Sequence, residues 1–517
     1  MNKTKKSLVN MVTSYAYKVV TMFLGILIPK LFITGYGSEI NGLQSSVTQI
    51  FSYIALLEAG IGASVIQSMY APVSSGDTKK INSYLSATTK YYNKIGFIYF
   101  GILTAVSIVY SLIIRVDQMP WHMVLLYILI TGTMGGANYF YLAKLKLLIS
   151  ATGDSYIDNV MLTATYVLTS VLKIVLIHFG IHIVILQVGT LAISVLVTLA
   201  YLIVAKRKYP WLSFKEKPDF SCTKQKGSVM IHRISSLIFQ NVDILLLTFF
   251  CDLTTVSIYT MYKLIINMIN TVVATLGDSM NFVFGQKMNT KDPGHTEYKK
   301  LIDTYNVFYS ALSMGLFTVT YLLILPFMRL YTRGMDADYI IEVLPWLYIA
   351  IEVLTVGRES MMRTIEVAGH FKKTQWRAVW ETVINLVASI VGILVFKHFF
   401  GNVGGLYGAL AGTVAAMLYR TIDMNIYANK HILNRSAFKS FYVMCTNAAV
   451  FVFVALVFKR FVPSIDSYLE FFLHAIWITA IVVLLFVAIQ SALNVKELKH
   501  ALKFVKAKLK RKQRTTT

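Results

Sequence analysis

The sequence is dominated by unbroken apolar stretches, each about 20 residues or longer. A helix of that length crosses the hydrocarbon core of a bilayer, which is about 30 Å thick. The stretches are continuous and do not alternate with a period of two, as the strands of a membrane barrel do. Only 14% of the 517 residues are charged, against about 25% in typical soluble domains. The chain is therefore predicted to be an all-α integral membrane protein.

Hydropathy predicts about fourteen transmembrane helices, separated by short polar connections. The longest connections, residues 71–91 and 206–228, are too short to hold a folded domain. The predicted spans are residues 8–34, 40–70, 92–114, 121–149, 155–178, 181–205, 229–250, 254–285, 301–328, 343–367, 377–397, 403–428, 437–459 and 470–493.

Lysine and arginine are unevenly distributed among these connections. They concentrate at the N-terminus, in alternate connections such as residues 206–228, and in the C-terminal tail. Because basic connections stay on the cytoplasmic side, both termini are predicted to be cytoplasmic. The formal net charge is +24, but the sequence has no basic domain and no nucleic-acid-binding motif, so no nucleic-acid partner is expected.

Short patterns recur along the chain at separations of 216 to 223 residues. Residues 79–81 (KKI) match 299–301 (KKL), 151–153 (ATG) match 367–369 (VAG), and 189–190 match 412–413 (both GT). Repeats of this kind occur in transporters, with the binding site between the halves. The predicted parts are an N-terminal six-helix lobe (1–205), a cytoplasmic linker (206–228), a C-terminal six-helix lobe (229–428), two additional transmembrane helices (429–493) and a basic cytoplasmic tail (494–517).

Ionisable residues inside the predicted spans are costly in lipid and mark a cavity or a buried partner. The basic members are Lys18, Lys263, Arg358 and, closer to the end of its span, Arg233; the acidic members are Glu58, Asp243 and Glu352. For each residue singly, a structural ion pair and a substrate contact both remain open. Together they favour a water-filled cavity. Glu359 and Arg363 lie four residues apart on one helix, which predicts a local ion pair.

No arrangement of residues points to catalysis. The histidines lack the spacing of metal ligands, and no serine, cysteine or histidine constellation suggests a nucleophile. The largest extracytoplasmic connection, near residues 329–342, is too short for a catalytic domain. The chain is therefore predicted not to be an enzyme, with no metal and no cofactor. A membrane-embedded polysaccharide polymerase remains the alternative of a different class.

Two further patterns concern packing and the tail. Gly404, Gly408 and Gly412 lie on one helix face, which predicts close approach of two helix backbones. The tail carries an apolar stripe among lysines and arginines: Val495, Leu498, Leu502, Val505 and Leu509. This stripe predicts an amphipathic helix on the cytoplasmic leaflet, and a solvated charged end is the open alternative.

Several short motifs are spread along the chain. Residues 35–43 read GYGSEINGL, 57–62 read LEAGIG, 69–72 read MYAP, and 241–245 read NVDIL; Lys30, Asp77 and Tyr259 complete the set. These motifs resemble Wzx-type oligosaccharide flippases, the polysaccharide-transporter branch of the multidrug/oligosaccharidyl-lipid/polysaccharide exporter superfamily. The resemblance extends over essentially the whole chain.

The resemblance implies two six-helix bundles that work by alternating access in a bacterial cytoplasmic membrane. The implied substrate is an undecaprenyl-pyrophosphate-linked oligosaccharide, moved to the outer leaflet for surface polysaccharide biosynthesis. Lys18, Lys263, Arg358 and Arg233 would attract the pyrophosphate, and Glu58, Asp243 and Glu352 would act as counter-ions or carry a coupling ion. The implied partners are this lipid-linked oligosaccharide and membrane lipid, with a polysaccharide polymerase and glycosyltransferases in the same pathway. A drug/cation antiporter and a lipid II flippase of the same superfamily remain alternatives.

Overall fold

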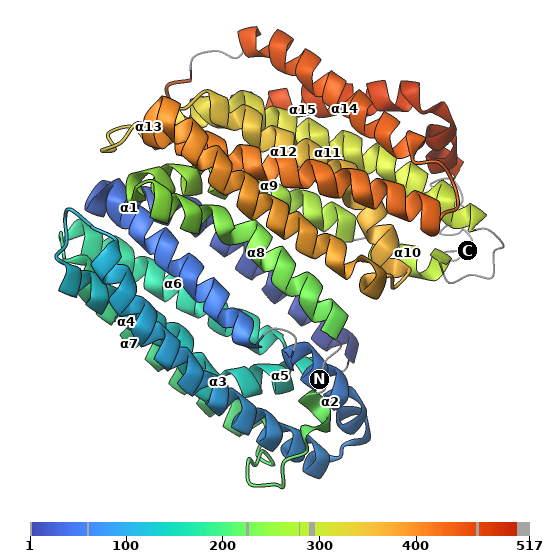
Figure 1. Ribbon diagram of the computed structural model, residues 1–517. Helices are drawn as coiled ribbons and strands as arrows, with labels where there is room; N and C mark the ends of the chain where they lie inside the picture. The colour runs from blue at the N-terminus through green and yellow to red at the C-terminus, as the bar shows by residue number, and fades with distance from the viewer. Residues whose placement is uncertain are drawn as a thin grey trace. The chain divides into compact units, whose positions relative to one another are not determined.

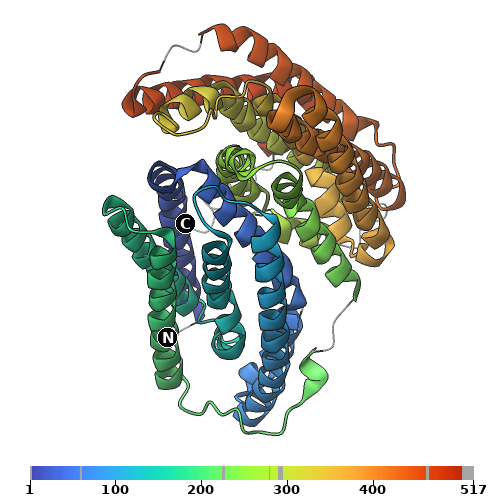
Figure 2. The ribbon, with the colours of Figure 1, turned by 60° about the vertical axis from the view of Figure 1, so that its left-hand side comes forward.

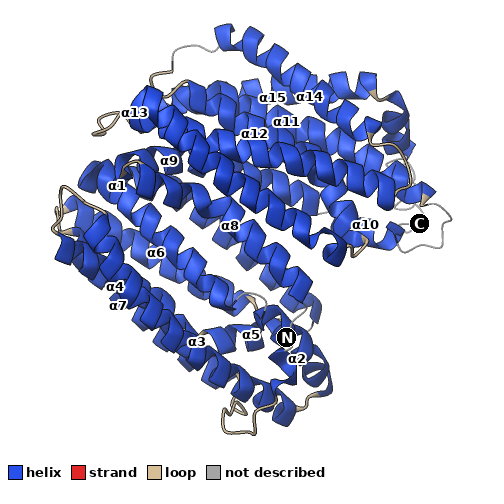
Figure 3. Cartoon of the chain, in the orientation of Figure 1, coloured by secondary structure: helices blue, strands red, loops and turns tan. Residues whose placement is uncertain are grey.

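A computed structural model of the chain describes residues 3–58, 61–223, 227–278, 280–288, 295–461 and 465–503. The described residues are helical almost throughout and contain no β-strand (Figure 3). Large apolar side chains such as Phe97, Leu196 and Leu484 are more than half exposed. Side chains of this kind face lipid in a membrane protein, so the all-α membrane prediction is confirmed.

Ten helices in the described residues are long and apolar enough to cross a membrane. Two of them contain a sharp turn. In α1 (Lys3–Ile54) the backbone turns at Gly37, and in α13 (Phe371–His431) it turns at Gly401. Both residues have positive φ, a conformation that glycine adopts without the penalty of a Cβ atom. Each of these two helices therefore supplies two spans.

Two less apolar helices complete the predicted set. α8 (Gly227–Phe250) contains a shorter apolar segment, Ile234–Phe250. α12 (Val343–Val367) has the length of a span and carries several charged residues. With the two divided helices and these two, the described residues contain fourteen span-length segments, in agreement with the hydropathy prediction.

The chain divides into two compact units, and unit 1 comprises Met1–Ile258 and Gly334–Ala337. In this unit α1 packs on α6 and α8, α3 packs on α4, and both α4 and α6 pack on α7. These helices run roughly along one another in both views (Figures 1 and 2). The remaining elements of unit 1 are η1 (Ala55–Glu58), α2 (Ile61–Ser75), α3 (Thr78–Ile113), α4 (Trp121–Tyr141), α5 (Ala143–Ala151), α6 (Tyr156–His178), α7 (Ile183–Lys208) and η2 (Phe220–Thr223).

Unit 2 comprises Tyr259–Arg333 and Asp338–Thr517. Its central helix is α11, which packs on α10, α12, α14 and α15. Of the 18 consecutive residues of α11 that are most apolar, 72% are buried. The other elements are α9 (Leu253–Asp278), which begins in unit 1, α10 (Asn281–Met288), α11 (Thr296–Tyr331), α12, α13, α14 (Phe438–Phe458), η3 (Lys459–Phe461) and α15 (Tyr468–Leu493). The predicted six-helix lobes divide earlier in the chain than these units, before α8.

The glycine face predicted for close packing lies in the second limb of α13. A Cβ atom on Gly408 would lie 2.1 Å from the carbonyl carbon of Gly392, and one on Gly412 would lie 2.3 Å from the backbone nitrogen of Ser389. Real Cβ atoms do not approach other atoms so closely, so only glycine fits at these positions. The packing prediction is confirmed: the two limbs of α13 meet backbone to backbone.

A tight turn joins α5 to α6 at the recurring ATG motif. Gly153 has a φ of 73°, and the Asp154 carboxylate that follows it is 1% exposed. Lys6 Nζ and Lys208 Nζ lie 2.8 and 3.1 Å from Asp154 Oδ1, and the Tyr209 hydroxyl donates to Oδ2 at 2.8 Å. Burial alone would raise the pKa of Asp154, but the bonds from Lys6, Tyr209 and Lys208 outweigh it and hold this pKa below its ordinary value.

The VAG motif forms a turn of the same backbone geometry between α12 and α13. Gly369 has a φ of 68°, and the His370 N–H donates to a carbonyl five residues earlier, as the Asp154 N–H does in unit 1. The Tyr427 hydroxyl lies 3.1 Å from His370 Nδ1. Burial, with the nearby charges of Lys373 and His431, lowers the pKa of His370.

Candidate functional site

In unit 1 the predicted site residues lie on α1, η1 and α8. Lys18 is exposed on α1, and its Nζ lies 5.9 Å from the centre of the Tyr15 ring. Glu58 is half-buried at the end of η1 and interacts electrostatically with Lys146. The backbone of Arg233 lies in α8, and its side chain is outside the described part of the chain.

Asp243 is the most buried of the predicted residues in unit 1. It lies on α8, is 4% exposed, and interacts electrostatically with Tyr53 of α1. The Tyr53 hydroxyl also donates to the Ile238 carbonyl at 3.2 Å. Asp243 therefore lies at the packed contact between α1 and α8.

In unit 2 the guanidinium of Arg358 has a close acidic partner. Arg358 lies nine residues before the end of α12, about 14 Å along the helix. Its Nη1 is 2.6 Å from Glu381 Oε1 on the first limb of α13. The second carboxylate oxygen of Glu381 lies 3.2 Å from Nε of Arg420, on the second limb. One carboxylate is therefore shared by two arginines from different helical segments.

The same network continues beyond Arg420. Arg420 is 2% exposed and its Nη1 lies 3.0 Å from Asp423 Oδ2; Asp423 also pairs with Arg377. The guanidinium carbon of Arg377 lies 4.7 Å from the centre of the Tyr427 ring. We name Arg358, Glu381, Arg420, Asp423 and Arg377 the charge ladder. Its three arginines and two carboxylates leave one positive charge in excess.

Two other predicted residues of unit 2 have polar or aromatic neighbours. Glu352 of α12 is 4% exposed and accepts a hydrogen bond from Asn270 Nδ2 of α9 at 2.8 Å. Lys263 of α9 is half-buried, with Nζ 5.4 Å from the centre of the Tyr259 ring. Glu352 also interacts electrostatically with Arg358, so the structure groups these two predicted residues on α12.

The predicted local pair on α12 is present and has further partners. Arg363 Nε lies 2.7 Å from Glu359 Oε1, and Arg363 Nη1 lies 3.0 Å from Asp278 of α9. Asn281 of α10 also accepts a bond from Nη1 at 2.9 Å. This second cluster joins α9, α10 and α12. Among the described residues, it shares no ion pair with the charge ladder.

Sequence reasoning selected Arg358 and missed the other four members of the charge ladder, Glu381, Arg420, Asp423 and Arg377. Glu381 is an acidic residue ten positions inside an apolar helix, which is itself a signal of a buried partner or cavity. Its partners lie on another helix and on the other limb of α13, so no spacing along the sequence reveals the pairing. Arg420 and Asp423 are three residues apart, and that pair is readable from sequence.

The chemistry of the charge ladder suits a phosphate. Arginine presents a planar set of donors that matches carboxylate and phosphate oxygens in the same way. Glu381 already occupies this position at Arg358, so its carboxylate shows how an anionic oxygen fits there. The five residues of the charge ladder carry one excess positive charge, and the Glu352 carboxylate interacts electrostatically with Arg358 at its edge.

Unit 1 contains a separate cavity of about 500 Å³ between α4, α5, α6 and α7. Its walls are mostly apolar, and Lys146 is the charged side chain that lines it. Lys146 Nζ lies 3.6 Å from Asp158 Oδ1. The cavity and the charge ladder are therefore independent features of their own units.

The sequence matches no protein-family model and no curated protein. Solved structures are similar in fold. The inward closed conformation of the lipid II flippase MurJ aligns with 94% of this chain and all of its own, with a TM-score of 0.64 at 13% identity. An inward-facing multidrug resistance MATE family transporter of the MOP superfamily aligns with 79% of this chain and 95% of its own, with a TM-score of 0.62 at 15% identity. The chain thus has the fold of these multi-pass membrane transporters.

Proposed function

We propose that the chain is a flippase that moves an undecaprenyl-pyrophosphate-linked oligosaccharide across a bacterial cytoplasmic membrane for surface polysaccharide biosynthesis. The observation that carries this proposal is the fold shared with a lipid II flippase over 94% of the chain. Lipid II is a lipid-linked substrate, and the motifs in residues 35–43, 57–62 and 241–245 favour the oligosaccharide branch. Both termini are proposed to be cytoplasmic, from the distribution of basic residues.

In the proposed mechanism, cationic side chains contact the pyrophosphate as the two six-helix lobes alternate. Lys18, Lys263 and Arg358 are assigned this role because each lies inside a span, and Arg233 is assigned to the end of the path. Glu58, Asp243 and Glu352 hold these cations or carry a coupling ion when substrate is absent. The burial of Asp243 and Glu352, each 4% exposed, supports a role inside the protein for both.

Within the charge ladder, the proposed substrate contact is an exchange of anions at Arg358. A phosphate oxygen takes the position of Glu381 Oε1, and Glu381 keeps its bond to Arg420. Hydrogen bonds between ionised groups are about twice as strong as neutral ones, so the exchange replaces one strong bond by another. Arg358 is therefore paired with an anion before, during and after the exchange.

The proposal is tested with purified protein in proteoliposomes. A fluorescent polyprenyl-pyrophosphate oligosaccharide is placed in both leaflets, and an impermeant quencher reports how fast inner-leaflet molecules reach the outer leaflet. We expect faster exchange with the protein than in empty vesicles. Fluorescent lipid II and a cationic dye are assayed in parallel, because each represents one alternative transporter of the same superfamily.

The outcomes separate the alternatives. Movement of lipid II alone would identify a cell-wall flippase, and uptake of the cationic dye alone would identify a drug/cation antiporter. Elongation of the glycan would indicate a polymerase. Normal oligosaccharide exchange by a variant with Lys18, Lys263 and Arg358 all changed to alanine would overturn the proposed binding site while leaving the flippase assignment in place.

A further inference from the structure

The chain continues as a helix after its last apolar span. α15 ends at Leu493, and Asn494 forms a buried turn whose side chain donates to the Gln490 carbonyl at 3.0 Å. Residues 495–503 are then helical, and we name this segment the tail helix. Since α15 is a membrane span, the tail helix begins where that span leaves the hydrocarbon.

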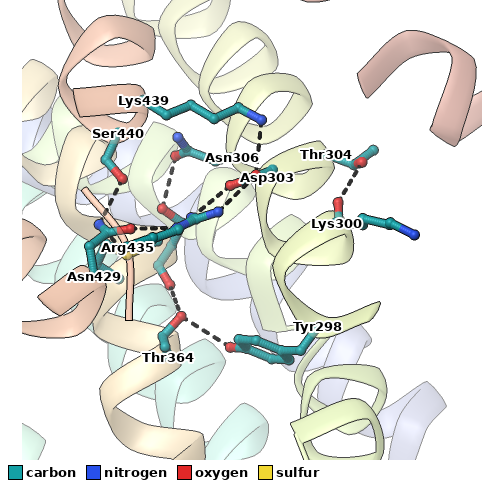
Figure 4. A network of polar contacts seen from close by, with 12 residues as sticks. Tyr298, Lys300, Asp303, Thr304, Asn306, Thr364, Asn429, Arg435, Lys439 and Ser440 are labelled. Carbon is teal, nitrogen blue, oxygen red and sulfur yellow. Dashed lines mark hydrogen bonds and ion pairs between the residues drawn. The ribbon is translucent and has the colours of Figure 1, made fainter. Parts of the chain in front are cut away.

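One face of the tail helix is bonded to unit 2. Glu497 pairs with Lys439 of α14, and His500 Nδ1 lies 2.9 Å from the Thr304 hydroxyl of α11. Lys439 in turn pairs with Asp303 of α11 at 2.9 Å (Figure 4). The tail helix is therefore attached to two helices of unit 2.

Asp303 is itself held firmly at this junction. It accepts two hydrogen bonds from the Arg435 guanidinium, at 2.7 and 2.9 Å, and Arg435 Nε donates to Asn429 at 2.7 Å (Figure 4). Bidentate pairs of this kind fix geometry as well as adding stability. The anchor for the tail helix is consequently a rigid part of unit 2.

The opposite face of the tail helix is exposed. Val495 and Leu502 are 47% and 52% exposed, and at 3.6 residues per turn they share a face with Lys499. Lys496 and Lys503 flank that face and are also exposed. None of these three lysines forms a salt bridge with another described residue. We name these five residues the outer face.

We propose that the outer face is a binding site for anionic phospholipid on the leaflet where α15 ends. The two apolar side chains would enter the upper acyl region, and the lysine stems would extend so that their ammonium groups meet lipid phosphates. The charge favours an anionic leaflet, and the continuity with α15 places the helix at headgroup depth. Leu498, which the sequence pattern assigns to the same stripe, is half-buried and is not part of the site.

The anchoring gives this site a property that a free basic tail lacks. The helix is already formed and oriented by Lys439 and Thr304, so lipid binding does not bear the entropic cost of ordering the segment. Loosening the anchor should therefore weaken lipid binding even though no outer-face residue is changed. Thr304→Val removes one bond of the anchor without altering any charge.

The test uses full-length protein lacking Cys222, Cys251 and Cys445, with Leu502→Cys carrying an environment-sensitive nitrobenzoxadiazole dye. The protein is placed in nanodiscs of phosphatidylcholine with increasing phosphatidylglycerol. We expect a blue shift and quenching by spin-labelled lipid as the anionic fraction rises, both reversed by high salt because the attraction is screened.

Paired variants identify the residues responsible. Each lysine near an anionic surface contributes about fivefold in affinity, so Lys496→Gln with Lys499→Gln should raise the phosphatidylglycerol fraction needed for half the effect by several-fold or more. The matched control, Lys215→Gln with Lys217→Gln, removes the same charge from an exposed connection and should change nothing. Thr304→Val should give an intermediate loss.

Three results would overturn the proposal. The first is the same dye emission with and without phosphatidylglycerol at low salt. The second is an equal loss from the control pair, which would show a response to net charge alone. The third is blue-shifted emission in pure phosphatidylcholine nanodiscs that spin-labelled lipid does not quench, which would mean that protein covers the outer face. Size-exclusion chromatography of each variant excludes misfolding as the cause of a lost signal.

Discussion

The turn at Gly153 in unit 1 and the turn at Gly369 in unit 2 have the same backbone and different chemistry. In unit 1 the residue after the glycine is Asp154, fully compensated by two lysines and a tyrosine. In unit 2 it is His370, bonded to the hydroxyl of Tyr427. Unit 2 also contains a cluster of charges within its spans, the charge ladder.

The difference separates a structural ion cluster from a candidate binding site. Asp154 lies outside the apolar spans, where water can reach its lysine partners, which are 27% and 29% exposed. Arg420 of the charge ladder is as buried as Asp154, but its partners Glu381 and Asp423 are only 11% and 15% exposed. Buried charges within membrane spans are costly, and for this reason the charge ladder, and not Asp154, is proposed as a substrate contact.

The largest expected effect is on transport, and it tests whether the two clusters differ in role. Arg358→Ala should leave the protein folded, because Glu381 keeps its bond to Arg420. Losing a bond between charged groups should slow oligosaccharide exchange roughly tenfold to a hundredfold. The matched control is Lys6→Ala, which likewise removes one of two cations on a shared carboxylate and should exchange at the normal rate. Equal exchange rates for both variants in proteoliposomes would show that the charge ladder and the Asp154 cluster do not differ in their role in transport.

The next effect is on stability and concerns the centre of the charge ladder. Arg420→Ala would take the shared arginine from Glu381 and Asp423, leave each with a single arginine partner, and open a void at a fully buried position, at a cost of about 3–5 kcal/mol. Thermal unfolding in detergent should show a large loss, and Arg420→Lys, which keeps a cation at this position, should lose less. A variant as stable as the unchanged protein would show that water already reaches this site.

A smaller loss is expected in unit 1. Asp154→Asn removes two ion pairs but keeps a hydrogen bond to Tyr209, and the freed lysines can turn to water. The expected cost is about 1–3 kcal/mol, below that of Arg420→Ala in the same unfolding assay. A larger loss for Asp154→Asn would reverse the ranking and mark unit 1 as the unit more dependent on its buried charge.

The smallest effect is on the pH dependence of stability. The pKa of His370 is lowered in the folded protein, so acidification through about 6.5, the ordinary histidine value, favours the unfolded chain. The pKa of Asp154 is also lowered, but for an acid this stabilisation persists above about 3.9 and is lost only below it. His370→Gln should therefore flatten the decline in unfolding temperature between pH 8 and 5, and Asp154→Asn should not. Identical slopes for both variants would contradict this assignment.

The fold was largely predictable because the length of an apolar run is a local property of the sequence. The fourteen spans follow from it, including the pair within α13, where Gly401 provides the turn. Gly408 and Gly412 were also readable, since small residues four apart define a helix face. The division of the chain into compact units was not predictable, because it depends on which helices pack together; α8 packs on α1.

The candidate site was predictable only in part. Arg358 and Glu352 were selected from their depth alone. Glu381 was not selected, because its partners lie on other helical segments and periodicity carries no information about pairing between helices. The tail shows the same limit: the stripe through Leu498 is regular in sequence, but Glu497 and His500 bind unit 2 and turn Leu498 toward the protein.

The backbone contact between the two limbs of α13 also bears on leakage. At Gly392 and Gly408 the limbs are too close to admit even a methyl group, so no chain of water molecules can run between them there. Under the proposed function, the protein must move a large substrate without letting protons or sodium leak through the same path. The glycine contact closes the space between the two limbs of α13, which carry Glu381 and Arg420. Ions can therefore reach these two charges only from a direction other than this contact.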